Sequence, residues 1–171
     1  PEYVQGDTVR VTAAAAYYSG GPLVNSPVEW SILASPFNFY WSDPEGQRWF
    51  SFNPFDETRV DYDPFANDFY GLVKQGTGMT DAEGNVTIEL PADLGQSLQS
   101  QNWRVSVMVR SPNDQYVSAE QSFPVHRGSY YIGISPRSYV AKLGVTTDID
   151  LITIDPQGVF RPETALDVVV Y

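Results

Sequence analysis

The chain has no cysteine, few basic residues, no long apolar run and little helical periodicity. The lack of cysteine excludes disulfides, thiolate metal sites and cysteine nucleophiles. The 21 acidic residues outnumber the 10 basic ones and give a net charge of −11, which repels phosphate backbones and anionic headgroups. We therefore expect no nucleic-acid partner. No segment approaches the roughly 18 consecutive apolar residues of a membrane helix, so we expect no direct membrane insertion.

The start of the chain and its composition bear on where the protein works. The first residue is Pro1, with neither an initiator methionine nor a charged-then-apolar signal segment, so we expect the true N-terminus to lie upstream. Aromatic residues make up 14% of the chain and charged residues only 18%. This composition, without cysteine, favours a periplasmic or extracellular β-protein over a cytosolic helical one.

Alternating apolar residues predict short β-strands between turns rich in glycine, proline and aspartate. The expected strands are residues 8–17, 27–33, 86–90, 103–110, 116–125, 130–134, 146–154 and 165–171. Residues 92–100 are the one helical candidate, and we expect one turn there at most. This pattern favours an all-β fold made of antiparallel, immunoglobulin-like β-sandwiches.

The two ends of the chain share a pattern. Residues 6–33 align without a gap with residues 144–171, and the alternating apolar positions fall in register. The three identities are Gly6 with Gly144, Thr8 with Thr146, and Gly20 with Gly158. A repeated supersecondary unit requires such a register; the alternative is two ordinary hairpins that share it by chance. We place a domain boundary near Arg127 and Gly128, with a sandwich over residues 1–127 and the beginning of a second, incomplete one over residues 128–171.

Residues 34–72 form a long insertion between expected strands. It is rich in aromatic residues interleaved with acidic ones, and its rings are Phe37, Phe39, Tyr40, Trp41, Trp49, Phe50, Phe52, Phe55, Tyr62, Phe65, Phe69 and Tyr70. Rings beside carboxylates suit sugars or cationic peptides. The other interpretation is that the rings cover a sandwich face or a neighbouring domain, because a soluble domain rarely exposes so large an apolar patch.

The sequence offers little for catalysis. His126 is the only histidine and follows a strand; without a positioned nucleophile or further ligands we expect a structural role for it. The pairs Asp61 with Asp63 and Asp148 with Asp150 are spaced two residues apart, so we expect each pair to share a strand face, where solvated charge is more usual than a calcium site. Residues 80–84, TDAEG, suit a turn. We therefore predict no catalytic residue, no metal ligand and no cofactor.

Several of these segments, taken in order, resemble the macroglobulin-like domains of bacterial alpha-2-macroglobulins. The segments that carry the resemblance are the strand over residues 6–16, YYSGGP at residues 17–22, VEW at 28–30, the rings at 37–41, TDAEG at 80–84 with the strand after it to residue 91, VH at 125–126, YYIGI at 130–134 and DPQG at 155–158. Each segment alone is weakly specific, but their order spans nearly the whole chain. The resemblance implies two macroglobulin-like sandwiches, the second incomplete.

The resemblance also implies a role. In that family a protease cuts a bait segment, the body of the inhibitor rearranges, and the protease is trapped, often through a thioester formed between a cysteine and a glutamine. This chain has no cysteine, so it holds no thioester, and no stretch stands out as bait. The resemblance therefore implies a non-catalytic structural module whose partners are neighbouring domains of one long chain, with target proteases bound through other regions.

The second hypothesis is a carbohydrate- or ligand-binding β-sandwich of a surface or secreted protein, with the aromatic insertion as its site. The two hypotheses differ in the exposure of the rings. In a binding module Trp41, Trp49 and Tyr62 line an exposed platform, whereas in a structural module they are buried.

Overall fold

The computed structural model describes residues 1–44, 46, 48–52, 71–138, 140, 143–162 and 165–168. The chain divides into two compact units. Unit 1 comprises Pro1–Phe37 and Glu57–Arg127, and unit 2 comprises Asn38–Asp56 and Gly128–Tyr171. Residues 38–56 of the aromatic insertion thus belong to unit 2, although the strands before and after the insertion lie in unit 1.

Unit 1 contains a five-stranded sheet. Its strands, in the order in which they lie side by side, are β1 (Tyr3–Val4), β7 (Tyr116–His126), β6 (Gln101–Arg110), β3 (Pro27–Pro36) and β4 (Gly71–Met79). The long neighbours are antiparallel, and only the short β1 runs parallel to β7. The alternating apolar residues of β3 and β6 point to one face of this sheet, where they are buried.

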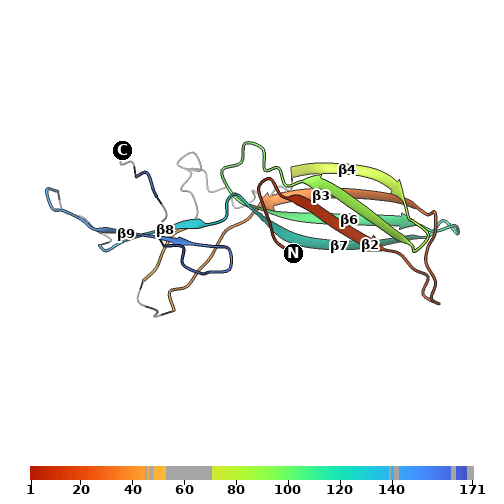
Figure 1. The fold of residues 1–171 in the computed structure, drawn as a ribbon, viewed down its shortest axis with the longest axis horizontal. Helices are drawn as coiled ribbons and strands as arrows, with labels where there is room; N and C mark the ends of the chain where they lie inside the picture. Colours follow the sequence, from red (N-terminus) through yellow and green to blue (C-terminus); the bar gives the residue numbers. More distant parts are fainter. Residues whose placement is uncertain are drawn as a thin grey trace. The chain divides into compact units, whose positions relative to one another are not determined.

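A second sheet covers that face. It consists of β2 (Thr8–Ala14) paired antiparallel with β5 (Asn85–Pro91), and Figure 1 shows β2 lying against the larger sheet. Val9 and Ile88 of the small sheet join Ile32 and Trp103 of the large sheet in one buried apolar cluster. Two sheets, antiparallel except for the short β1, pack around one core and form the immunoglobulin-like β-sandwich that the sequence predicted, so the predicted all-β fold class is confirmed.

The turn between β4 and β5 is fixed by side-chain hydrogen bonds. The buried Thr80 hydroxyl accepts a hydrogen bond from the Ser26 amide at 2.9 Å and donates to the Leu23 carbonyl. Asp81 Oδ1 accepts a hydrogen bond from the Asn85 amide at 2.7 Å. The turn chemistry predicted for residues 80–84 is therefore confirmed.

Gly84 in this turn has a positive φ of 80° and makes a close backbone approach. Its carbonyl accepts a hydrogen bond from the Ala15 amide at 2.9 Å. A Cβ atom at this position would lie 2.5 Å from the Ala15 carbonyl oxygen and 2.9 Å from Pro22 Cβ. Only glycine fits here without moving the end of β2.

Unit 2 contains a two-stranded antiparallel sheet of β8 (Tyr131–Pro136) and β9 (Ile149–Ile154). After β9 the chain turns back, so that Ile154 forms a β-bridge with Phe160. Residues 165–168 are described but lie in no strand.

The segment after β9 repeats the segment after β2 in hydrogen-bonding detail. The sequence alignment of residues 6–33 with residues 144–171 places Ala16 on Ile154 and Pro22 on Phe160, and both pairs form antiparallel bridges. Three further backbone hydrogen bonds match. After β2 they run from Tyr17 N to Gly21 O, from Gly20 N to Tyr17 O and from Leu23 N to Ala15 O. After β9 the corresponding bonds run from Asp155 N to Val159 O, from Gly158 N to Asp155 O and from Arg161 N to Thr153 O. The two segments therefore share a hairpin of the same geometry. The turns at Asp81–Asn85 and Ser111–Gln115 in unit 1 close with the same pair of hydrogen bonds, so this geometry is a common hairpin type and does not by itself distinguish a repeat from a chance likeness.

The described residues contain no helix. Residues 92–100 hold one turn, in which the Ser97 amide donates to the Leu94 carbonyl at 3.2 Å, as the prediction of one turn at most allows. Three details differ from the sequence prediction. The two-residue strand β1 was not expected. The strand β4, within and just after the predicted insertion, was missed. Residues 165–168 of the expected strand over residues 165–171 are described but lie in no strand, and the other residues of that expected strand lie outside the described ones.

The described part of the chain has no helix long and apolar enough to cross a membrane.

The close backbone approach at Gly84 can be tested by comparing two alanine substitutions, one at Gly84 and one at Gly20 in the turn after β2. Gly20→Ala places a side chain at φ 91° in open space, and we expect it to lower the free energy of unfolding by about 1 kcal/mol. Gly84→Ala adds the steric conflict with Ala15 and Pro22, and we expect a loss of about 3 kcal/mol. Chemical denaturation followed by circular dichroism measures both; equal losses would show that the close approach at Gly84 does not matter.

Candidate functional site

The aromatic insertion packs on one face of the unit 2 sheet. Phe39, Phe50 and Phe52 are all buried. The ring of Phe39 stacks on the ring of Tyr131 from β8, with centroids 4.1 Å apart and planes 4° from parallel, and meets the ring of Phe52 edge-on at 5.2 Å. These rings provide the apolar cover that a two-stranded sheet needs on this face.

Trp41 extends this cluster to the turn after β9. Its ring is half-buried and meets Phe160 edge-on at 5.4 Å and Phe50 at 6.1 Å. A Cβ atom on Gly158 would lie 3.3 Å from the Trp41 ring, so the glycine of the repeated turn is also a contact of the insertion. The aromatic cluster therefore joins the insertion to both β8 and the segment after β9.

The backbone of the insertion also pairs with β8. Ser51 and Ile134 exchange two hydrogen bonds, each 2.9 Å long, and form an antiparallel bridge. Next to it, a Cβ atom on Gly133 would lie 2.6 Å from the Phe52 ring and 2.8 Å from Ile152 Cγ1. Gly133 therefore leaves the space in which Phe52 packs.

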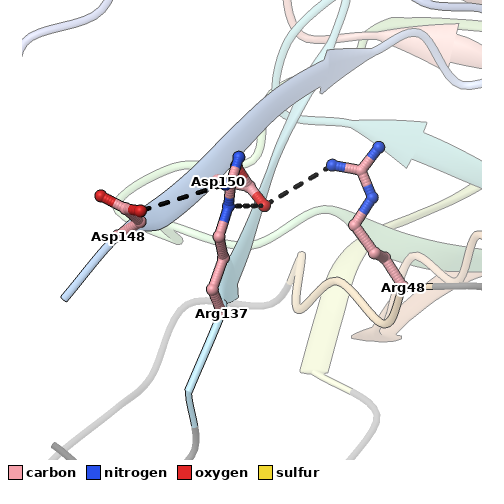
Figure 2. A network of polar contacts seen from close by, with 4 residues as sticks. All are labelled: Arg48, Arg137, Asp148 and Asp150. Carbon is pink, nitrogen blue, oxygen red and sulfur yellow. Dashed lines mark hydrogen bonds and ion pairs between the residues drawn. The ribbon is translucent and has the colours of Figure 1, made fainter.

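Figure 2 shows a network of ion pairs around Asp150. The strand register places Asp150 on the same face of the sheet as Gly133 and Ile152, which the insertion covers. Arg137, just after β8, places its Nη2 2.9 Å and its Nε 3.1–3.2 Å from carboxylate oxygens of Asp150 on β9. Arg48 of the insertion reaches the same carboxylate at 3.5 Å, and Asp148 lies 4.0 Å from Arg137. Asp150 thus connects the insertion to the sheet.

The electrostatics of this network favour permanent charge. The hydrogen bonds from Arg137 lower the pKa of Asp150 and the charge of Arg48 adds to the effect, while the hydrogen bonds to Asp150 raise the pKa of Arg137. Groups held charged in this way are poor general acids and bases at neutral pH. Two arginines around one carboxylate also leave a poor place for a metal cation.

His126 lies at the end of β7, as the sequence predicted. It is 2% exposed, its ring meets Phe37 edge-on at 5.5 Å, and its carbonyl accepts a hydrogen bond from the Gln5 amide at 2.8 Å. Burial lowers its pKa, and the Glu2 carboxylate, 3.9 Å from Nε2, only partly opposes this shift. These contacts suit a neutral histidine that holds β1 against β7.

The predicted acidic pairs have separate outcomes. Asp148 and Asp150 share a strand face as expected, but both face Arg137. Asp61 and Asp63 lie outside the described residues. Among the residues that the structure describes, no group of three or more His, Cys, Asp or Glu side chains could hold a metal ion.

The aromatic side chains of the insertion differ in how far they are exposed. Trp41 is half-buried in the cluster, whereas Trp49 is 75% exposed and Tyr40 is 81% exposed. Tyr62 lies outside the described residues. Arg48 and Arg137 complete the site, but neither was predicted as a site residue. The position of Arg137 just after an expected strand is the one sequence signal for it. No sequence signal connects Arg48 to Arg137, because the two residues are far apart in the sequence.

Comparison with known proteins links the chain to one group of structures. No protein-family model and no curated protein matches it. The chain is similar to a part of Escherichia coli alpha-2-macroglobulin in its native conformation, with a TM-score of 0.60 and 13% identity over 94% of this chain. The same protein activated by porcine elastase gives 0.59 and 13% over 92%, and a Salmonella alpha-2-macroglobulin mutant gives 0.59 and 12% over 94%.

These likenesses concern the fold. The chain spans only 10–13% of the length of those proteins. The match covers 94% of this chain, which is more than either unit contains alone. The matched residues therefore come from both units. The expected resemblance to bacterial alpha-2-macroglobulins is thus supported in structure, although the sequences differ at most positions.

The role of Asp150 can be tested with two neutral substitutions. We expect Asp150→Asn to speed hydrogen exchange at the Ser51 and Ile134 amides, because it removes the charge that connects Arg48 and Arg137. Asp148→Asn is the matched control: its carboxylate is mostly exposed and 4.0 Å from Arg137, so exchange should change little. Equal exchange rates in both variants would show that the network does not hold the insertion.

The buried histidine predicts a pH dependence of stability. Above the ordinary histidine pKa of about 6.5, both folded and unfolded states are neutral. Below it the unfolded state binds a proton that the folded state excludes, because burial lowers the folded pKa, so the free energy of unfolding falls as the pH drops from about 6.5 to 5. In chemical denaturation at several pH values, His126→Gln should flatten this slope; an unchanged slope would contradict the assignment.

Proposed function

We propose that this chain is a non-catalytic structural module of a bacterial alpha-2-macroglobulin-like protease inhibitor, which traps proteases after bait cleavage. The observation that carries the proposal is the likeness to the Escherichia coli and Salmonella proteins, with TM-scores of 0.59–0.60 over 92–94% of the chain. In this proposal the module keeps neighbouring domains in the geometry that the trap requires.

The organisation of the chain supports a tandem arrangement. Residues 1–127 are proposed as one macroglobulin-like sandwich, whose insertion contributes residues 38–56 to unit 2, and residues 128–171 as the beginning of a second. The alignment of residues 6–33 with residues 144–171, together with the matching hydrogen bonds around Gly20 and Gly158, supports this assignment. The proposed partners are the neighbouring domains of the same long chain, while target proteases bind regions outside residues 1–171. The proposed location is the periplasm or the cell exterior.

The geometry of the site also supports a structural role. The aromatic cluster of Phe39, Phe50 and Phe52 is buried against β8 and β9, and the charged groups beside it neutralise one another. The alternative, a carbohydrate- or ligand-binding module, is favoured by the exposed rings of Tyr40 and Trp49. Two exposed rings are a small platform beside the buried part of the insertion.

The proposal predicts that packing within this module supports trapping. In the longer protein that carries this chain, a trapped protease should keep its activity on a small peptide but lose it on a large protein substrate. We expect Phe52→Ala, which removes about 3 kcal/mol of packing, to reduce this size-dependent protection after incubation with elastase. Tyr40→Ala changes an exposed ring of the same insertion and is the matched control.

Two results would contradict the proposal. One is full activity on the large substrate with the unsubstituted protein, which would show that no trap forms. The other is saturable binding of an oligosaccharide that Trp49→Ala abolishes, which would favour the binding module.

A further inference from the structure

The two faces of the β8–β9 sheet have different surroundings. The pairs Gly133 with Ile152 and Ser135 with Asp150 put these residues on the face that the aromatic insertion covers. The opposite face carries Ile132, Ile134, Ile149 and Leu151, which are 36–55% exposed. Four exposed aliphatic side chains on one side of a two-stranded sheet form an apolar surface that favours a partner.

The alignment of β9 with β2 identifies this surface as an inner face. The alignment places Val11 on Ile149 and Ala13 on Leu151. In unit 1 Val9 is buried in the core between the sheets, and Val11 and Ala13 pack against that core. The exposed aliphatic face of unit 2 therefore corresponds to the side of β2 that packs inside the sandwich.

The edge of β9 that faces away from β8 can also be compared with β2 in unit 1. The Arg137 amide donates to the Asp148 carbonyl at 3.0 Å, so the backbone groups of Asp148, Asp150 and Ile152 point toward β8. Alternation directs the backbone groups of Ile149 and Leu151 to the opposite edge. Within the described ranges, β8 is the only strand in the sheet with β9. In unit 1 the corresponding edge of β2 is paired with β5 along its whole length.

A groove lies at the end of this edge. It has a volume of about 420 Å³ and is lined by Leu151, Ile152, Thr153, Phe160, Arg161, Pro162 and Leu166. In unit 1, Gly84 approaches Ala15, Pro22 and Leu23, and the alignment places these three residues on Thr153, Phe160 and Arg161. The groove thus corresponds to the place where the turn before β5 docks in unit 1.

We propose that the outer edge of β9 and this groove form an acceptor site for one antiparallel β-strand that follows a turn with a left-handed glycine. The strand pairs with Ile149 and Leu151 as β5 pairs with Val11 and Ala13, and its turn glycine enters the groove. The occupant is a segment with the backbone of residues 80–91 that lies outside this chain. The proposal rests on the alignment of β9 with β2 and on the exposed edge of β9, and it does not require protease trapping.

Charge complementarity specifies the occupant further. In unit 1 Arg10 on β2 pairs with Glu89 on β5 at 2.5 Å. The alignment places Asp148 on Arg10, so the charge at this position is reversed in unit 2. The incoming strand should therefore carry a lysine or arginine opposite Asp148.

Two peptides with the sequence of residues 79–92 test the site, one unchanged and one with Glu89→Lys. Titrated into the isotope-labelled chain, the lysine peptide should shift the amide resonances of Ile149 and Leu151 saturably. It should bind about fivefold more tightly than the unchanged peptide, because attraction to Asp148 replaces repulsion. The difference should disappear in the Asp148→Asn chain, and a lysine peptide that also carries Gly84→Val should bind more weakly.

A pair of chain variants tests the edge itself. Leu151→Pro removes an amide that points away from β8, so the sheet is retained while peptide binding is lost. Leu151→Val keeps the amide and should bind normally. The proposal is overturned if neither peptide binds saturably, if the two peptides bind equally, or if the shifts fall on β2 because β5 is displaced. A dimer that protects the Ile149 and Leu151 amides without peptide would overturn it as well, since a second copy would then occupy the edge. These results are independent of the trapping assay.

Discussion

A sheet of two strands cannot bury its own apolar side chains, and this constraint determines how unit 2 is built. One face of the β8–β9 sheet is covered by Phe39, Phe50 and Phe52, which come from a distant part of the sequence. The ion pairs around Asp150 lie at the margin of this apolar contact. Burial therefore provides the main stabilisation, and the charges help to fix which part of the insertion lies on the sheet.

Unit 1 shows the same strand and turn in a closed sandwich. There β2 has β5 along its edge, and the apolar residues of both strands share a core with the larger sheet. The turn around Gly84 closes the end of that arrangement through the Ala15 amide. Comparison of the two units thus separates what the local sequence determines, namely the hairpin after the strand, from what a neighbouring strand must supply.

Much of the fold could be predicted from local patterns. The alternation of apolar residues in β3 and β6 and the glycine of the repeated turn at Gly158 carry their structural meaning in the sequence itself. The strand β4 could not be predicted in this way, because it is rich in glycine and lacks alternation. Gly76 shows the reason: a Cβ atom there would lie 2.5 Å from the Trp30 ring, a constraint that depends on tertiary packing.

The candidate site was harder to predict than the fold, because its members are distant in sequence. Arg48, Arg137 and Asp150 meet only after the insertion has packed on the sheet. That packing also has a topological consequence. The chain passes from one unit to the other before Asn38, before Glu57 and again after Arg127. The units are thus tethered by three covalent crossings, so a single backbone nick at any one of them leaves the halves connected by the remaining two.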